Sequence, residues 1–142
     1  MDHSVKELKM YRIPDDGVVS TPGQSKCWIE EGILFSVAFE KIFVDLKEAK
    51  EITKAFKQLS DKPMPLFVDL ATSAGQSSET RNYFATDPAH LSTFSACALF
   101  VSNPVARVIA NIYMGLVKPE RPTRLFTKYD DAIDWLNQFK EG

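Results

Sequence analysis

The stretch Asn103–Phe126, NPVARVIANIYMGLVKPERPTRLF, combines a helix, a turn rich in proline and basic residues, and a strand. Asn103 suits a helix N-cap, and Pro104 suits the first helical position, where its missing N–H costs no hydrogen bond. KPERP ends the helix and TRLF is a short strand. A helix that leads directly into a strand indicates an α/β fold. Five apolar residues at helical spacing are expected to face the core: Val105, Val108, Ile109, Ile112 and Leu116.

The polar face of this helix is narrow, because Arg107 is the one charged residue between Pro104 and Val117. Asn111 and Met114 fill most of the rest of that face. A helix of this kind is either buried by its own chain or docked against a partner. A second apolar band lies beside the core-facing one and consists of Ala106, Ala110, Tyr113 and Val117. The N-terminal segment has three apolar residues that could cover it: Met10, Tyr11 and Ile13.

Regular elements also alternate along the rest of the chain. KCWIEEGILFSVAF, residues 26–39, predicts two strands joined by a hairpin turn at 30–32. A helix follows, with Asp45 and Glu48 as a capping box and apolar residues at helical spacing up to Leu59. The later elements are the strand LFVDL at 66–70, a loop over 71–77, a short helix, the strand ACALFV at 96–101, the helix and strand of 103–126, and a last helix capped by Thr127.

This order, ββ-α-β-α-β-α-β-α, predicts an α/β fold with a single mixed, mainly parallel sheet of about five strands and four covering helices. Residues 26–142 are expected to form this domain. Residues 1–25 are an irregular N-terminal tail or supply an extra strand. The 142 residues, 44% of them hydrophobic and 25% charged, suit one globular domain.

Composition argues against several classes of partner. The chain has 17 Lys and Arg against 19 Asp and Glu, and this net charge of −2 offers no footprint for nucleic acid or for an anionic membrane. No apolar run reaches the roughly 20 residues that a transmembrane helix needs. The two cysteines, Cys27 and Cys97, are too few for a disulfide scaffold, so we expect a cytoplasmic protein.

The element order, together with WIEEGILFSVAF, LFVDL and NPVARVIANIYMGLVKPERPTRLFTKYDDAIDWL, resembles a group of small uncharacterised bacterial proteins. They belong to the superfamily of sulfate-transporter and anti-sigma-factor-antagonist (STAS, or SpoIIAA-like) domains. The resemblance covers about Lys26 to Phe139. In well-known members, a serine or threonine at the start of the second helix is phosphorylated inside an Asp-Ser-Ser/Thr-Gly motif, and this switches binding to a partner kinase or regulator. The resemblance therefore implies a STAS-like fold and a regulatory role.

The phosphorylated position of the superfamily corresponds to Ser77 and Ser78. Asp69 ends the matching strand, but Gln76 precedes Ser77, no Gly follows Ser78, and the loop is longer. A phosphate at a helix N-terminus is stabilised by free N–H groups and by the helix dipole. Alternatively, one of the two serines is simply the N-cap of its helix, which contributes about 1 kcal/mol.

A second candidate site is a pocket at the carboxyl ends of two parallel strands. The loops after LFVDL and after ACALFV should lie at the same edge of the sheet, where open α/β sheets bind ligands. Arg107, one turn into the next helix, could hold an anion bidentately, or it could form a structural ion pair with Asp69. The two loops would bring together five polar residues: Asp69, Thr72, Ser73, Ser102 and Asn103.

Nothing in the sequence suggests catalysis or a metal. A Ser-His-Asp order, a G-x-S-x-G turn and a phosphate-binding glycine loop are all missing. His3 lies in the tail and His90 in a loop after Asp-Pro, and neither has a second ligand at zinc-binding spacing. Cys27 and Cys97 are expected to be core thiols. We therefore expect no enzyme activity, no cofactor and no metal.

Two functions stay open. The first is a non-enzymatic regulatory or protein-interaction module, a homodimer or bound to another regulatory protein, with Ser77 or Ser78 as a possible switch. It would dock through the helix after Ser78 and the helix 103–117, and the residues expected at this surface are Asp69, Ser73, Asn103, Arg107, Ala110, Asn111, Tyr113 and Met114. The alternative is a protein that binds a small apolar or anionic ligand, as lipid-binding domains do, in a cavity lined by some of its ten Phe residues.

Overall fold

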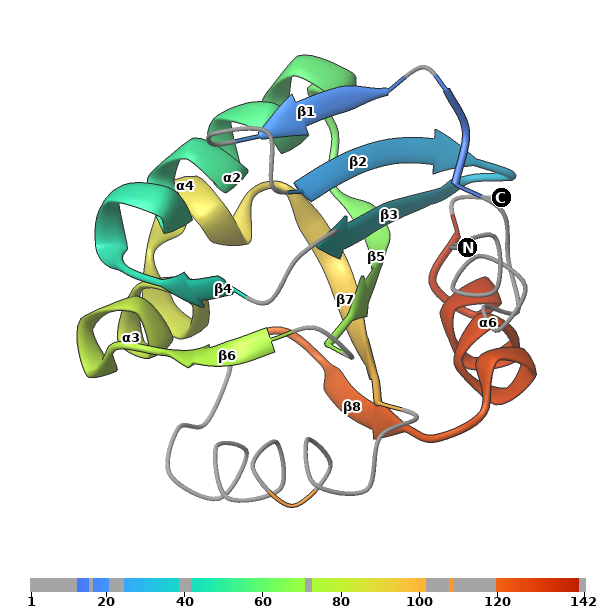
Figure 1. Cartoon of the computed structure of the whole chain (residues 1–142). Helices are drawn as coiled ribbons and strands as arrows, with labels where there is room; N and C mark the ends of the chain where they lie inside the picture. The colour runs from blue at the N-terminus through green and yellow to red at the C-terminus, as the bar shows by residue number, and fades with distance from the viewer. Residues whose placement is uncertain are drawn as a thin grey trace.

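The computed structural model describes residues 13–15, 17–20, 25–38, 42–70, 73–101, 108 and 120–140. Its strands are β1 (Val18–Ser20), β2 (Ser25–Glu30), β3 (Ile33–Ala38), β4 (Ile42–Val44), β5 (Met64–Asp69), β6 (Ser73–Gln76), β7 (Phe94–Phe100) and β8 (Thr123–Phe126). Its helices are α2 (Leu46–Leu59), α3 (Ser78–Thr86), α4 (Pro88–Leu91) and α6 (Tyr129–Asn137). Figure 1 shows these elements in order along the chain.

The main sheet has six strands in the order β1-β2-β3-β5-β7-β8. β1, β2 and β3 are antiparallel, whereas β3, β5, β7 and β8 run parallel to one another. The predicted α/β fold with one mixed, mainly parallel sheet is therefore confirmed. The five predicted strands are β2, β3, β5, β7 and β8, and β1 adds a sixth at the edge beside β2.

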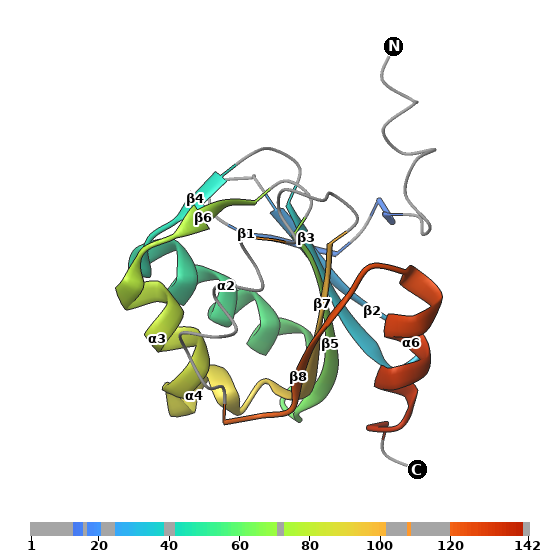
Figure 2. The same cartoon turned by 90° about the horizontal axis from the view of Figure 1, so that it is seen from below.

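The described helices cover the two faces of this sheet. Figure 2 shows α2, α3 and α4 on one side and α6 on the other. α6 faces the core with Ala132 and Leu136, which are fully buried, and with Ile133 and Phe139, which pack against the core. The helix begins one residue later than predicted, with Lys128 rather than Thr127 at its N-cap. The predicted helix 103–117 lies outside the described residues except for Val108, which is helical.

A second, two-stranded sheet was not predicted. β6 pairs in parallel with β4, so that Ile42 lies opposite Ser73 and Val44 opposite Gln76. The prediction of a loop over 71–77 is therefore wrong for residues 73–76. Strands of three and four residues are too short for their periodicity to be visible in the sequence. The N–H of Ser77 also donates to the carbonyl of Val44 at 3.3 Å, which ties the start of α3 to this small sheet.

Two local predictions are confirmed. The hairpin between β2 and β3 turns at Glu31 and Gly32, whose φ angles of 50° and 79° are those of a two-residue turn that matches the twist of the strands. The capping box of α2 is present, because the Glu48 carboxylate accepts from the N–H of Asp45, the N-cap, at 3.1 Å.

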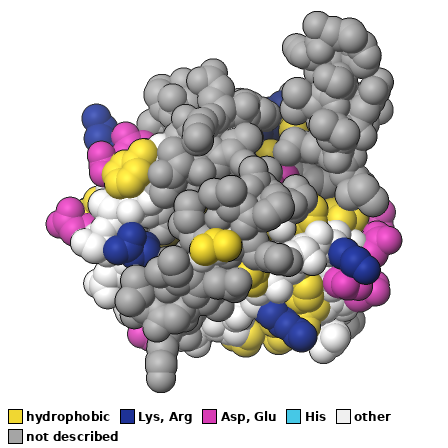
Figure 3. Space-filling model, turned by 60° about the horizontal axis from the view of Figure 1, so that its bottom comes forward, with side chains coloured by type: hydrophobic (Ala, Val, Ile, Leu, Met, Phe, Trp, Pro, Cys, Tyr) yellow, Lys and Arg dark blue, Asp and Glu magenta, His cyan; other side chains and the backbone are white. Residues whose placement is uncertain are grey.

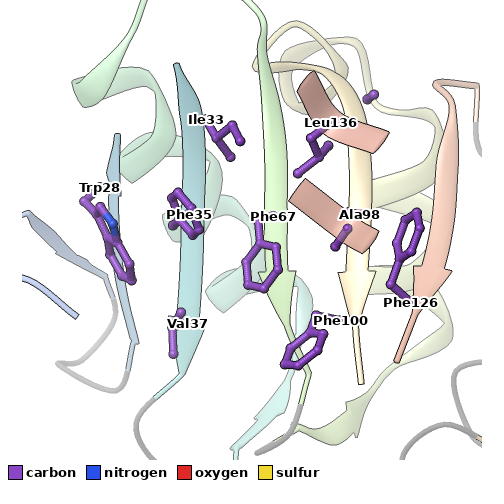
Figure 4. Packing of buried hydrophobic residues seen from close by; sticks show 11 residues of the cluster. Trp28, Ile33, Phe35, Val37, Phe67, Ala98, Phe100, Phe126 and Leu136 are labelled. Atoms are coloured by element: carbon purple, nitrogen blue, oxygen red, sulfur yellow. The ribbon is translucent and has the colours of Figure 1, made fainter. Parts of the chain in front are cut away.

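The core on the α6 side is a row of rings that crosses the sheet (Figure 4). Phe67 of β5 is fully buried, and its ring centroid lies 5.2 Å from that of Phe35 and 5.5 Å from that of Phe100. Trp28 of β2 stacks on Phe35 at 5.3 Å. Tyr129 at the start of α6 meets Phe67 edge-on at 5.4 Å. Aromatic rings thus fill the space between the sheet and α6.

The core on the α2 side contains both cysteines. Cys27 of β2 and Cys97 of β7 are buried with Leu34, Phe56 and Leu66. Burial raises the pKa of each thiol to about 12, because it disfavours the thiolate. The expectation that both cysteines are core thiols is confirmed.

Ile13, the first described residue, lies on the opposite, α6 side. Ile13 packs against the cluster that contains Trp28 and Phe35, and the Lys26 ammonium donates to the carbonyls of Pro14 and Asp15 at 2.8 and 2.9 Å. Ile13 therefore belongs to the core on the α6 side. Two other residues that were expected to cover the helix 103–117, Met10 and Tyr11, lie outside the described residues.

Candidate functional site

The predicted rim lies where β5 and β7 end together. Asp69 is the last residue of β5 and lies opposite Phe100, the last residue of β7, and the N–H of Leu70 donates to the Phe100 carbonyl at 2.9 Å. Asp69 is buried, with 6% of its surface exposed. Ser73 belongs to β6. The pocket itself stays a prediction, because Thr72, Ser102, Asn103 and Arg107 lie outside the described residues.

Ser77 is the N-cap of α3. Its hydroxyl oxygen accepts from the N–H of Thr80 at 3.1 Å and lies 2.8 Å from the Thr80 hydroxyl. Ser78 follows as the first helical residue, and its side chain is exposed. The expectation that one of the two serines caps this helix is confirmed for Ser77. The hydroxyl of Ser78 is exposed and is not the N-cap of α3, which is Ser77.

A cation lies one turn into the same helix. The Arg81 guanidinium donates through Nη1 to the carbonyl of Gln76 at 3.0 Å, which joins α3 to the end of β6. The side-chain oxygen of Gln76 is buried and has no hydrogen-bond partner. A positive charge and the free N–H groups of a helix N-terminus thus surround the two serines.

A buried polar network connects α2, α3 and α4. The Tyr83 hydroxyl donates to the hydroxyl oxygen of Thr53 at 2.9 Å, and that oxygen lies 2.9 Å from Nδ1 of His90. The Thr53 hydroxyl also lies 3.2 Å from the carbonyl of Ala49. Thr53 has a single proton, so when it donates to Ala49 the imidazole must donate from Nδ1. Thr53 and His90 are both buried, with 4% of their surface exposed.

The prediction that His90 lies in a loop is wrong. Asp87 accepts from the N–H of Ala89 at 2.9 Å and Pro88 opens α4, so Asp-Pro starts a helix and His90 points into the protein. Asp at the N-cap followed by Pro at the first helical position is a recognised start signal, and it could have placed this helix from the sequence. The partner of His90, Thr53, is 37 residues away, and no local pattern indicates that contact.

Aromatic rings surround His90. Its ring centroid lies 4.7 Å from that of Phe84, 5.3 Å from Phe94, 5.7 Å from Tyr83 and 6.1 Å from Phe56. Burial among these rings lowers the pKa of His90 to about 4, and the nearby Asp87 carboxylate opposes this in part. The imidazole is therefore neutral at physiological pH and acts as a hydrogen-bonding group of the core.

Within the predicted helix 103–117, the structure describes Val108 alone, and 59% of its surface is exposed. It was predicted to face the core, and that prediction is wrong. Val108 lies at the edge of the predicted core-facing set, and a second apolar band runs beside that set, so the apolar pattern did not fix which side faces inward. Five residues of the predicted docking surface lie outside the described residues: Arg107, Ala110, Asn111, Tyr113 and Met114.

Glu120 and Arg121, which follow the predicted helix 103–117 in the sequence, contact α3 and α4. The N–H of Glu120 donates to the carbonyl of Ala85 in α3 at 3.3 Å. Nε of Arg121 donates to the carbonyl of Leu91 in α4 at 3.2 Å. These two bonds bring the residues that follow the helix 103–117 next to the helix that starts at Ser78.

In the part of the chain that the structure describes, no group of three His, Cys, Asp or Glu residues could hold a metal ion. None of the helices described there is long and apolar enough to cross a membrane. The two cysteines are buried thiols with a raised pKa, so neither is an activated nucleophile.

The fold is similar to a solved structure, that of an uncharacterized protein from the DUF3478 family with a SpoIIAA-like fold, from Shewanella loihica PV-4. The two proteins share 13% sequence identity, the match covers 79% of this chain and 91% of the other, and the TM-score is 0.52. The resemblance to SpoIIAA-like domains is thereby confirmed for the fold. Among curated proteins, none matches this chain. The family model that matches residues 27–140 is described as a domain of unknown function, and this chain therefore belongs to the family DUF7793.

Proposed function

We propose that this chain is a non-enzymatic regulatory module that docks through α3 and the helix 103–117, with a second copy of the same chain as its partner. The observation that carries the proposal is the exposed side chain of Val108 on a helix with one charged residue between Pro104 and Val117. An apolar helix surface in contact with water is a common feature of protein interfaces.

The neighbourhood of α3 supports the joint surface. Glu120 and Arg121 bond to α3 and α4, so the chain that leaves the helix 103–117 runs beside α3. Figure 3, which brings the bottom of the molecule forward, shows hydrophobic and charged side chains of described residues at the surface. Apolar side chains exposed beside charged ones suit a docking surface.

Ser78 is the residue that we propose for regulation. A phosphate on this exposed hydroxyl would lie at the N-terminus of α3, and Arg81 follows three residues later on the same side of the helix. It would add about two negative charges beside the proposed interface and change how two copies meet. Ser77 is less suited, because its hydroxyl already caps the helix.

The test is the mass of the protein in solution as a function of concentration, measured by light scattering during gel filtration. We expect wild type to dimerise and Val108→Glu to remain a monomer with an unchanged circular dichroism spectrum. Ala110 belongs to the docking surface predicted from the sequence, and on an ideal helix its position lies about 200° from position 108. Ala110→Glu therefore distinguishes the two sides of the helix, because dimerisation lost in this variant and kept in Val108→Glu would contradict the role of Val108. A wild-type chain that stays monomeric at millimolar concentration would overturn the proposal.

The regulatory part has its own test. Ser78→Glu introduces a negative charge at the start of α3 and should shift the dimerisation constant, whereas Ser78→Ala should not. If both variants dimerise as wild type does, a role of Ser78 in regulation is refuted while the docking surface stands.

A further inference from the structure

α3 has little apolar anchoring of its own. Its fully buried side chains are those of Thr80 and Ala85, which are small, and the helix packs mainly against α2 and α4. Its larger rings, Tyr83 and Phe84, are half-buried and pack on His90 of α4. By contrast, α2 buries Phe56 and α6 buries Leu136 directly in the two cores. Few buried apolar contacts are what distinguishes the parts of a protein that open locally.

α3 and α4 form one unit. They meet at Asp87, which ends α3 and caps α4, and the rings of Phe84 and His90 approach to 4.7 Å. Leu91 at the end of α4 is the unit's main apolar contact with the α2-side core. A movement of α3 away from α2 would therefore carry His90 with it.

Polar bonds hold this unit against α2. The hydroxyl of Thr53 receives the bond from Tyr83 of α3 and contacts Nδ1 of His90 of α4, so one side chain of α2 binds both helices. These bonds lie beside the rings around His90, so opening would hydrate the polar groups and the rings together. Thr53 is the side chain of α2 that binds both helices, and further bonds join the unit to β4, β6 and residues 120–121.

Opening at this point would expose an apolar surface. His90 covers Phe56 of α2 and Phe94 of β7, with ring centroids at 6.1 and 5.3 Å. Both phenylalanines are buried, with 3% and 4% of their surface exposed. Release of the unit would uncover part of these two rings, next to the surface proposed for docking.

We propose that α3 and α4 form a latch, which opens from α2 as one unit while the main sheet stays folded, and which the Tyr83–Thr53–His90 network holds shut. A role of the latch in regulation rests on the proposed function, because Ser78 lies at the start of α3, and α3 belongs both to the latch and to the proposed docking surface. A phosphate on Ser78 or a bound partner would then act by shifting the balance between the shut and the open latch.

The test is amide hydrogen exchange of the full chain, read by mass spectrometry at constant pH. Peptides from 78–91 should exchange faster than those from β5 and β7. Tyr83→Phe and Thr53→Val should each speed exchange of 78–91 by about fivefold to tenfold, the effect of one lost hydrogen bond. The same bond is absent from the unfolded chain, so exchange of β5 and β7 should rise by no more than this factor and stay slower than that of 78–91. The matched control is Thr86→Val, which removes an exposed hydroxyl bond to Asn82 on the same helix and should change nothing.

The latch is refuted if 78–91 exchanges at the rate of β5 and β7 in wild type, or if neither Tyr83→Phe nor Thr53→Val speeds exchange of 78–91. The first result would mean that α3 and α4 unfold with the rest of the domain, and the second that the network does not hold them shut. Neither result bears on dimerisation, which Val108→Glu tests separately. A failure of the latch can therefore be told apart from a failure of the proposed function.

Discussion

At the scale of single residues, His90 shows how strongly its surroundings determine the chemistry of a side chain. Its imidazole is enclosed by four aromatic rings and bonded to Thr53, so its charged form is disfavoured in the folded state. A histidine of this kind stabilises the fold as a neutral group. It also makes the fold sensitive to acid.

The pKa of His90 predicts that sensitivity. The pKa is about 4 in the folded state and 6.5 in the absence of the fold, so below pH 6.5 the unfolded chain binds a proton that the folded chain does not. The free energy of unfolding should therefore fall as the pH drops from 6.5 to about 4, by about 3 kcal/mol in total.

Urea titrations over this pH range measure the effect. His90→Gln keeps a hydrogen-bonding group without the titration, so its stability should be lower at neutral pH but should fall less on acidification. The same pH dependence in both proteins would assign the loss to carboxylates rather than to His90.

Glu31 carries backbone strain that a single substitution should relieve. Glu31 lies in the turn between β2 and β3 and has a φ of 50°. Among the residues that the structure describes, no other residue apart from glycine has a positive φ. Asparagine tolerates this conformation better, so Glu31→Asn should raise the free energy of unfolding by about 1 kcal/mol. Thermal unfolding tests this, and Glu31→Gln is the control, because it removes the same charge and keeps the strain. An equal gain in both variants would point to charge instead.

At the scale of elements, helix starts explain where the chain turns from strand to helix. The N-caps of α2, α3 and α4 are Asp45, Ser77 and Asp87. Their side chains accept hydrogen bonds from N–H groups of the first turn, which have no partner within the helix. Glu48 in α2 and Pro88 in α4 are also suited to the first turn of a helix. These are short-range signals. The start of α2 at Asp45 and that of α3 at Ser77 or Ser78 were predicted from the sequence. The start of α4 at Asp87 and Pro88 can be recognised in the sequence in the same way.

The cap of α3 can be tested with two neighbouring serines. Ser77→Ala removes the acceptor for the N–H of Thr80 and should cost about 1 kcal/mol of stability. Ser78→Ala is the matched control, one residue further along, and should leave stability unchanged because its side chain is exposed. Urea unfolding measures both. Equal losses would show that the cap is not specific to Ser77.

At the scale of the whole molecule, the sheet separates two cores that are filled in different ways. Aromatic rings dominate the side that α6 covers, whereas aliphatic residues and the two cysteines dominate the side of α2. Parallel strands β5 and β7 are buried on both faces, as their almost continuous apolar sequences predict. The two cores share these strands, so loss of one should weaken the other.

The cysteines report on the integrity of the sheet. Cys27 and Cys97 lie on strands three places apart in the main sheet, both are buried, and the pKa of each is raised to about 12. Neither should react with a disulfide reagent at mildly alkaline pH until the domain unfolds, and urea should then speed both reactions together. Rapid labelling of Cys27 alone would show that the β1–β2 edge opens separately from β7.

The order of the five main strands with α2, α3 and α6, the hairpin at Glu31–Gly32 and the capping box of α2 were determined by the sequence alone. The reason is that hydrophobic period, turn residues and caps act between residues a few positions apart. These signals predict an α/β fold with a mixed sheet, and they also predicted a helix cap at Ser77 or Ser78.

Only the tertiary structure decided the pairing of β4 with β6, the burial of His90 against Thr53 and the exposure of Val108. The first two join segments about 30 or more residues apart, and such contacts depend on which surfaces the whole chain brings together. The third arises because a helix that is apolar on several sides satisfies its local pattern in more than one orientation. The side that meets water is chosen by the rest of the domain.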